Sequence, residues 1–259
     1  MPLLIWIVLF TAAGGLLSAL AASIFLVVPE SLRTRVLPHL VSFATGALLG
    51  AALLGLLPHA IEASGLADAH EIGLALLCGL LAFFVLEKLV LWRHCHQDIC
   101  EGHVPHDHDR DAASAKLILI GDAFHNVLDG VLIAAAFLTD VHLGIVTAIA
   151  VTAHEIPQEV GDLAILLHSG MTRARALTLN LLTSVTSVVG GVLAYFLLAD
   201  VTRLLPYALA IAASSFLYIA VADLIPGLHR RVDPGSGIKQ FVFIVLGVTV
   251  IYVSHRLAH

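Results

Sequence analysis

Charged residues are scarce in this chain of 259 residues: Asp, Glu, Lys and Arg together make up only 12% of it. Soluble domains carry about 25% charged residues, so the composition excludes an ordinary water-soluble globular protein. Hydrophobic residues make up 59% of the chain, and apolar runs of about 20 residues, long enough to cross a bilayer as helices, recur along most of it. The composition therefore predicts an all-α polytopic membrane protein.

Cysteines and nucleotide-binding motifs are scarce or absent as well. The three cysteines, Cys78, Cys95 and Cys100, are too few for a disulfide framework. No basic stretch precedes the first apolar segment, residues 3–28, so we interpret that segment as a retained helix and not as a signal peptide. No ATP-binding motif is present, which favours passive or secondary transport over an ATP-driven pump.

Apolar runs of spanning length predict eight transmembrane helices and a single transporter domain, residues 1–259. Each run is long enough to cross about 30 Å of hydrocarbon at 1.5 Å per residue. The predicted spans are residues 3–28, 37–60, 71–93, 114–138, 142–168, 174–198, 205–228 and 238–257.

Basic residues predict the orientation of these spans. Of the thirteen Lys and Arg residues, eleven fall in or beside the loops 1–2, 3–4, 5–6 and 7–8, and only Arg203 and Arg256 fall on the other side. Positive residues concentrate on the cytoplasmic side of membrane proteins. We therefore expect both termini outside the cytoplasm, in a multi-pass protein of the cell (inner or plasma) membrane.

Two proline pairs suggest an internal repeat. Pro38 and Pro58 bracket the second predicted span, and Pro206 and Pro226 bracket the seventh with the same spacing. Because these spans run in opposite directions, the pattern favours an inverted repeat of spans 1–3 and 6–8 around a central pair, a 3+2+3 plan. In that plan the two triplets would move against the central pair.

Histidines crowd the connection at residues 94–113, which we expect on the cytoplasmic side. This tract can hold transition metals loosely, although its spacing matches no closed zinc finger. A polar connector without a metal role is the alternative. The candidate regulatory residues are His94, Cys95, His96, Cys100, His103, His106 and His108.

Two polar clusters interrupt the fourth and fifth spans and carry the chemistry. On span 4, Asp122, His125, Asn126 and Asp129 follow i, i+3, i+4 and i+7 spacing, which places them on one helical face. Span 5 carries two i, i+4 pairs and a further carboxylate. An unpaired carboxylate in mid-membrane costs at least about 2.5–3.5 kcal/mol, so these faces must turn toward each other or toward water. The span 5 residues are His154, Glu155, Gln158, Glu159 and Asp162.

Imidazole combined with carboxylate suits a divalent transition metal such as Zn²⁺, Fe²⁺, Mn²⁺ or Co²⁺. Cu⁺ prefers sulfur ligands, which both clusters lack, and Ca²⁺ and Mg²⁺ prefer oxygen alone. Pro157 adds a local break in backbone hydrogen bonding, because it cannot donate to the Ala153 carbonyl. The pattern predicts a cage that binds a transported cation, with no organic cofactor.

Two other interpretations remain open. The polar residues can form a network that only holds spans 4 and 5 together. Alternatively, His154-Glu155 is typical of an intramembrane metal-dependent hydrolase, whose signature is H-E-x-x-H. Gln158 stands where the second His of that signature should be, which argues against a protease.

The motifs HNVLDG (125–130) and HEIPQEVGD (154–162) resemble the paired signatures of the ZIP family of zinc and iron transporters. The second is similar to the HExPHExGD signature of one branch. The resemblance implies eight spans, uptake of Zn²⁺ (or Fe²⁺, Mn²⁺ or Cd²⁺) toward the cytosol, and a homodimer. By position, it implies metal ligands on both spans, with Glu159 able to contribute only if span 5 rotates or kinks. The ligands so implied are His125, Asn126, Asp129, His154, Glu155 and Gln158.

The chain departs from the family pattern at several positions. Gln158 replaces the second His of the branch signature and is a weaker ligand. Asp129 stands where many members have Glu. The sixth span lacks the carboxylate that some members supply, which puts a complete second metal site in doubt.

A route for the cation follows from the positions of other polar residues. We expect His59, Asp140 and His142 at the outer entrance, and Asp122, Asp162 and Asp223 along the pathway. Ordinary interface residues are the alternative for the entrance group. Because ligands bind metal when deprotonated, we expect affinity to fall as the pH drops through the range in which histidine protonates.

Overall fold

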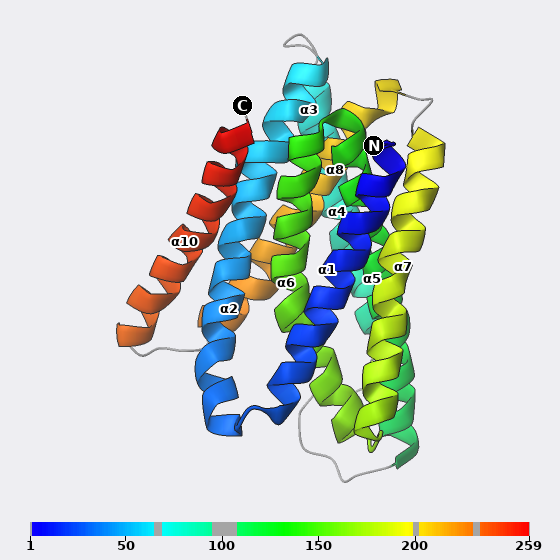
Figure 1. The fold of residues 1–259 in the computed structure, drawn as a ribbon, viewed down its shortest axis with the longest axis vertical. Coiled ribbons are helices and arrows are strands. Elements are labelled where there is room, and N and C mark those ends of the chain that lie inside the picture. The colour runs from blue at the N-terminus through cyan, green and yellow to red at the C-terminus, as the bar shows by residue number, and fades with distance from the viewer. Residues whose placement is uncertain (1, 65–68, 95–107, 199–201, 230–233, 259) are drawn as a thin grey trace.

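A computed structural model describes residues 2–64, 69–94, 108–198, 202–229 and 234–258, and every element in these ranges is helical (Figure 1). The all-α prediction is therefore confirmed. The elements are α1 (Leu3–Val27), α2 (Glu30–Gly50), η1 (Ala51–Leu56), α3 (Leu57–Ser64), α4 (Ala69–His94), α5 (His108–Thr139), α6 (Val141–His168), α7 (Arg173–Leu198), η3 (Thr202–Leu204), α8 (Leu205–Tyr218), η4 (Ile219–Leu224), α9 (Ile225–His229) and α10 (Pro234–Ala258).

Seven helical stretches in the described residues are long and apolar enough to cross a membrane. α6 is not among them, although its 28 residues are ample in length. The physical reason is its polar content, because His154, Glu155 and Glu159 lie within one stretch of it. All three side chains are buried in the protein, so none of them faces lipid.

Chain direction places the two termini together. α1 begins and α10 ends at the same end of the bundle, where α3 also lies (Figure 1). The junctions α1–α2 and α6–α7 lie at the opposite end. This agrees with an even number of crossings, and it puts Arg33, Arg35, Arg173 and Arg175 at the end away from the termini.

The helices pack as two groups joined at α6. α1, α5, α6 and α7 contact one another, while α2 packs on α10 and α4 on α8. Glycines allow the closest contacts between helices. A Cβ at Gly130 or Gly190 would collide with backbone across the α5–α7 contact. A Cβ at Gly46 or Gly247 would collide with backbone across the α2–α10 contact. These contacts do not settle the expected grouping of a central pair flanked by two triplets, which stays a prediction.

The second and seventh spans, which carry the two proline pairs, change helix type at the same distance from a proline. The π-helical segments η1 and η4 end two residues before Pro58 and Pro226, respectively. Pro38 does not bracket its span as expected, because α2 begins at Glu30 and Pro38 lies inside it. The paired π-segments, one in an ascending helix and one in a descending helix, support the inverted repeat, which stays a prediction.

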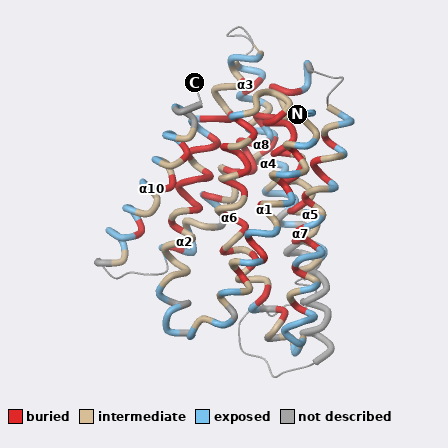
Figure 2. The backbone as a smooth tube through the Cα atoms, in the orientation of Figure 1, coloured by how far each residue is buried: buried red, intermediate tan, exposed pale blue. Residues whose placement is uncertain are grey.

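The apolar core lies mainly toward the end that carries the termini, where buried segments gather (Figure 2). It includes the large buried side chains Leu56, Phe137, Leu143, Leu209 and Phe216. These residues come from η1, α5, α6 and α8, so both helix groups contribute to it. Close packing of this kind leaves no space for a hydrated ion.

Candidate metal centre

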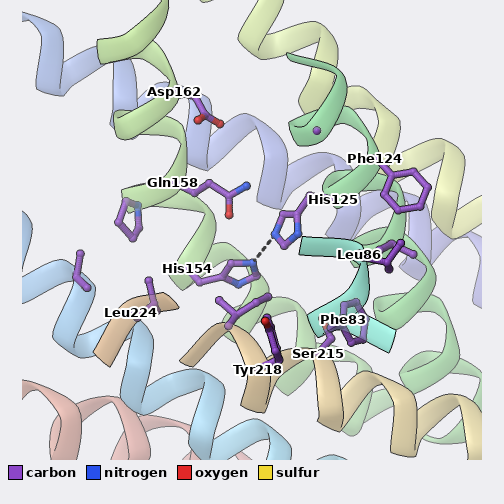
Figure 3. A pocket seen from close by; sticks show the side chains of 15 residues that line it. Phe83, Leu86, Phe124, His125, His154, Gln158, Asp162, Ser215, Tyr218 and Leu224 are labelled. Atoms are coloured by element: carbon purple, nitrogen blue, oxygen red, sulfur yellow. Dashed lines mark hydrogen bonds between the residues drawn. The ribbon is translucent and has the colours of Figure 1, made fainter. Parts of the chain in front are cut away.

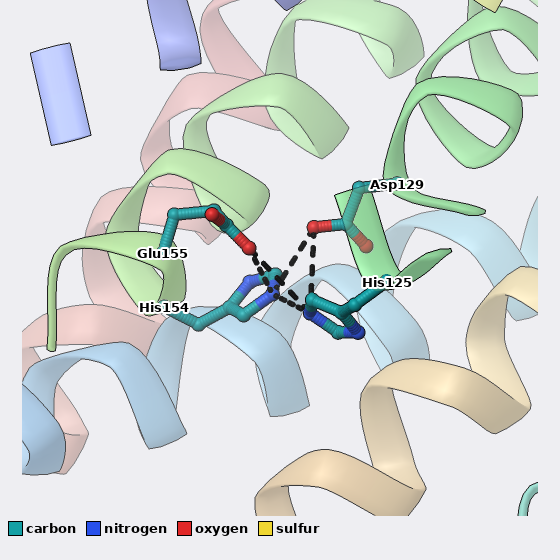
Figure 4. A group of neighbouring side chains, drawn as sticks. All are labelled: His125, Asp129, His154 and Glu155. Carbon is teal, nitrogen blue, oxygen red and sulfur yellow. Dashed lines mark hydrogen bonds and ion pairs between the residues drawn. The ribbon is translucent and has the colours of Figure 1, made fainter. Parts of the chain in front are cut away.

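Two histidines and two carboxylates converge where α5 and α6 cross. His125 and Asp129 lie one helical turn apart on α5, and His154 and Glu155 are adjacent on α6 (Figure 4). One side-chain atom from each residue lies within 4.8 Å of the others. The structure thus brings together four of the seven side chains that the sequence predicted as ligands.

Five of the six separations between these atoms are close to the edges of a tetrahedral site, and the sixth, between Asp129 and Glu155, is at most 4.8 Å. Nε2 of His154 lies 3.2 Å from Nε2 of His125 and 3.2 Å from Oδ2 of Asp129. The Oε1 atom of Glu155 lies 3.5 and 3.6 Å from the two imidazole nitrogens, and His125 lies 3.7 Å from Asp129. Four ligands at 2.0–2.1 Å from Zn²⁺ have edges of about 3.3–3.4 Å. The five separations depart from these edges by at most a few tenths of an ångström.

A backbone contact supports the orientation of the His154 ring. Its Nδ1 lies 3.3 Å from the Ala150 carbonyl oxygen, which can only accept a hydrogen bond. In a neutral imidazole that donates to this oxygen, Nε2 presents a lone pair to the cage. Such a bond from the distal nitrogen is the usual support of a metal-ligating histidine.

Burial of its two carboxylates favours a bound cation in this cage. Asp129 is 1% exposed, and His154 and Glu155 are 2% exposed. None of the four carboxylate oxygens of Asp129 and Glu155 has a hydrogen-bond partner. Buried charges are costly unless they are paired or coordinate a metal. A divalent cation would balance both carboxylates at once.

A cavity of about 520 Å³ reaches the cage from one side (Figure 3). His125 and His154 contribute to its wall together with Gln158 and Asp162, which lie successively further along α6 toward the end away from the termini. The opposite wall comes mainly from α4, α8 and η4, with Phe83, Tyr218 and Leu224 among its residues. The Phe216 ring packs edge-on against the His154 ring, with 6.2 Å between the ring centroids, and is fully buried.

The remaining predicted ligands lie elsewhere. The Asn126 amide donates to the backbone oxygen and Oδ1 of Asp122, which ties it to the preceding turn of α5. Glu159 accepts a hydrogen bond from Ser184 of α7 at 2.8 Å and is fully buried. Gln158 lines the cavity, where its side chain lies close to His154 (Figure 3).

The predicted entrance residues lie at the end that carries the termini. The carboxylate of Asp140 caps the start of α6, accepting hydrogen bonds from the backbone N–H groups of His142 and Leu143 at 2.9 Å. Partial burial would raise the pKa of Asp140, but these two hydrogen bonds and the nearby His142 and His59 hold it below its usual value. Nδ1 of His59 donates to the Gly55 carbonyl oxygen.

Several predicted residues cannot be placed. Cys95, His96, Cys100, His103 and His106 lie outside the described residues. The side chains of His94, His108 and Asp223 lie in helices but are not among those that the structure describes.

Sequence reasoning overlooked a polar stripe on α7. Asn180, Thr183, Ser184 and Ser187 are all buried, and they follow i, i+3, i+4 and i+7 spacing. The stripe was not predicted because it contains no carboxylate and no histidine, although its spacing is the same as that of the polar residues on α5. Phe216 was also missed, since one aromatic residue in an apolar span gives no signal.

Comparison with known proteins agrees with this arrangement. A profile of the family described as ZIP zinc transporter matches residues 93–255, which is more than half of the chain. Zinc transporter ZIP13 of Pongo abelii is 31% identical over 226 residues, which cover 83% of this chain and 65% of that protein. The chain thus spans slightly less than two thirds of that relative's length.

Two further relatives show a similar match. Zinc transporter YKE4 of Saccharomyces cerevisiae is 30% identical over 244 residues, covering 83% of this chain and 68% of that protein. Zinc transporter zipt-7.1 of Caenorhabditis briggsae is 27% identical over 313 residues, covering 96% and 79%. All three relatives are named as transporters, and none is named as an enzyme.

Proposed function

The chain belongs to the ZIP zinc transporter family, and from this premise we propose that it carries divalent transition-metal cations, Zn²⁺ foremost, across a membrane into the cytosol. The ligands are His125 and Asp129 of α5 with His154 and Glu155 of α6. The observation that carries the proposal is their near-tetrahedral spacing in a buried cage that holds two carboxylates without a hydrogen-bond donor.

The choice of zinc follows from the donor atoms. Two imidazole nitrogens and two carboxylate oxygens suit borderline cations, and their separations correspond to bonds of about 2.0–2.1 Å. The two carboxylates neutralise a divalent ion, so the loaded cage carries no net charge across the bilayer. Fe²⁺, Mn²⁺ and Cd²⁺ are the competitors for the same site.

The pathway runs from the end that carries the termini to the opposite end. His59, Asp140 and His142 collect the cation outside, and the cage receives it once its water is shed. In the conformation described, the cage connects with the cavity that leads past Gln158 to Asp162, while the close-packed apolar core lies mainly toward the end that carries the termini. This conformation would release metal to the cytoplasmic side.

The packing also suggests which parts move. Both ligand helices belong to the group formed with α1 and α7, and the cavity lies between that group and α4, α8 and η4. Displacing one group against the other would open the outer side of the cage and close the inner side. The expected homodimer and the regulatory role of residues 94–113 belong to the proposal as implications of the family alone.

Uptake of ⁶⁵Zn²⁺ into vesicles that contain the purified full-length protein tests the assignment. We expect His125→Ala and His154→Ala each to abolish saturable uptake, because each removes one of four ligands and leaves two buried carboxylates undercompensated. His229→Ala is the matched control, since His229 is exposed at the end of α9 and does not line the cavity. Unchanged saturable uptake in both site variants would refute the site.

Competition by Fe²⁺, Mn²⁺ and Cd²⁺ in the same vesicles ranks the cations. We expect Zn²⁺ and Cd²⁺ to compete most strongly at a site with two imidazole ligands, and Mn²⁺ to compete weakly. Stronger inhibition by Mn²⁺ than by Cd²⁺ would contradict the assignment of the imidazoles as ligands.

A further inference from the structure

Thr147 of α6 carries a buried hydroxyl group that has no partner among the described residues. The residue is 0% exposed, and its Oγ1 atom forms no hydrogen bond there. A buried hydroxyl group without a hydrogen bond is costly, because nothing repays the loss of its hydration. Valine has nearly the same shape and would fill this position without that cost. The hydroxyl group therefore calls for an explanation beyond packing.

Other threonines in the bundle satisfy their hydroxyl groups within their own helix. Thr11 and Thr45 are as deeply buried as Thr147, and each donates to the carbonyl oxygen four residues earlier at 2.8 Å. Thr152 does the same on α6, also at 2.8 Å. This bond needs only a choice of side-chain rotamer, and it is the usual one for a threonine inside a helix. Thr147 does not form it.

Thr147 lies on the face of α6 that leads to the metal cage. Seven positions separate it from His154, and seven separate it from Asp140, which caps the start of α6. Because seven residues make almost two full turns, the three polar side chains follow one line along the helix. At 1.5 Å per residue, Thr147 is about 10 Å from each of the other two along the helix axis. It is a polar group midway between the expected entrance and the cage.

Small and apolar residues flank Thr147 on this face. Leu143 is 1% exposed and Ala150 is 0% exposed, and both lie within one turn of it. Leu143 packs toward η1, where a Cβ at Gly55 would lie 3.4 Å from its Cδ1 atom. α6 contacts both α2 and η1. A displacement of these helices against α6 would therefore open this face and let water reach Thr147.

Transport needs a second conformation in which the outer side of the cage opens, and the inference rests on that proposed function. We propose that the Thr147 hydroxyl group is a positioning group of the outer route. It is unpaired while the outer side is closed, and it binds the hydration water of the entering cation when that side opens. The cost in the closed conformation and the gain in the open one both favour opening, against the apolar packing that favours closure.

Thr147→Val removes the hydroxyl group and keeps the shape of the side chain. In ⁶⁵Zn²⁺ uptake by vesicles that contain the purified full-length protein, the external Zn²⁺ concentration for half-maximal uptake should rise about tenfold, because the outward-open conformation loses population. Zn²⁺ binding in detergent, where the cage is accessible in either conformation, should change less than about threefold. Thr147→Ser keeps the hydroxyl group and should restore uptake. Thr152→Val is the matched control, since that hydroxyl group is paired within α6.

Thermal unfolding in detergent separates this role from a structural one. Thr147→Val should unfold at the same temperature as the unsubstituted chain or at a higher one, because valine replaces an unpaired buried polar group. A lower unfolding temperature would mean that a permanently bound water molecule holds the hydroxyl group, and it would overturn the proposal. An unchanged half-maximal Zn²⁺ concentration in Thr147→Val would overturn it as well.

Thiol labelling tests the opening directly. Thr147→Cys places a thiol on the line to the cage, whereas Ala148→Cys places one at a neighbour that is 2% exposed and lies on a different face of α6. A membrane-impermeant methanethiosulfonate reagent, applied outside intact cells that express the full-length chain, should label Thr147→Cys and not Ala148→Cys, above the labelling of the native cysteines. Equal labelling of the two variants would overturn the proposal.

The histidine variants keep the two proposals distinguishable. Saturable uptake that persists in His125→Ala and His154→Ala would refute the cage itself. Loss of uptake in those two variants, together with normal uptake by Thr147→Val, would leave the cage intact and overturn only the role of Thr147.

Discussion

Gly190 lies on α7 and contributes no ligand, but we predict that it controls the spacing of the metal cage. A Cβ at this position would collide with the backbone carbonyl of Val127, at a separation far below the 3.0 Å under which real Cβ atoms are essentially never found. The obstacle is backbone and cannot rotate away. Gly190→Ala must therefore move α5 and α7 apart by about 1 Å or more.

This displacement acts directly on the cage, because Val127 lies between His125 and Asp129 on α5. Their ligand atoms lie 3.2 Å from His154 Nε2, close to the edges of about 3.3–3.4 Å of a zinc tetrahedron. A shift of about 1 Å is several times larger than the difference between these distances and the tetrahedral edges. We expect zinc affinity to fall about 10–100-fold, the range for lost support around a metal site, and the fold to lose about 1–3 kcal/mol from overpacking.

Thermal unfolding in detergent with and without Zn²⁺, together with ⁶⁵Zn²⁺ uptake, measures both effects. Gly161→Ala is the control, since a Cβ at Gly161 of α6 would meet nothing within 4 Å. It should leave uptake unchanged and stabilise the helix by about 0.5–1 kcal/mol. If Gly190→Ala bound zinc and unfolded like the unsubstituted chain, the α5–α7 contact would not position the cage and the reasoning would fail.

Two further predictions concern the ends of the bundle. Asp140→Ala should cost about 1 kcal/mol of unfolding free energy at neutral pH through loss of the α6 cap. The pKa of Asp140 is lowered in the folded protein. Its contribution to stability is therefore present above the unfolded pKa of about 3.9 and disappears as the pH falls through the folded pKa, so the difference in unfolding free energy between the variant and the unsubstituted chain should shrink below about pH 4. A constant difference across that range would contradict this prediction. Replacing residues 95–107 by a Gly/Ser linker of equal length should preserve ⁶⁵Zn²⁺ uptake while changing its dependence on metal concentration, and complete loss of uptake would place the tract in the pathway.

The helical ends follow closely from the sequence, and the local helix type does not. α4, α6, α7 and α10 lie within a few residues of the predicted ranges because hydrophobic length and flanking polar residues specify where a chain enters and leaves lipid. The π-segments η1 and η4 give no such signal. Each adds one residue to a turn of a continuous helix, which changes neither length nor hydropathy measurably.

The residue types that gather at the cage were also predictable, whereas the set of residues that meet there was not. Helical spacing puts Glu155 and Glu159 on one stripe, and the sequence treats them alike. In the structure Glu155 lies at the cage and Glu159 accepts a hydrogen bond from Ser184. The difference depends on which neighbour each turn of α6 meets, since α5 crosses it at one level and α7 contacts it at the next.

The amino-acid sequence by itself therefore determined that this chain is an all-helical membrane protein, and it predicted a transition-metal site on the fourth and fifth spans. An unpaired carboxylate in mid-membrane is costly, so the sequence alone indicates that these side chains meet partners or water. Only the tertiary structure decided that His125, Asp129, His154 and Glu155 meet in one cluster, while Asn126 and Glu159 form hydrogen bonds elsewhere. That choice depends on how the helices cross, and Gly130 and Gly190 set the contact between α5 and α7. The period of a single helix does not encode such a crossing.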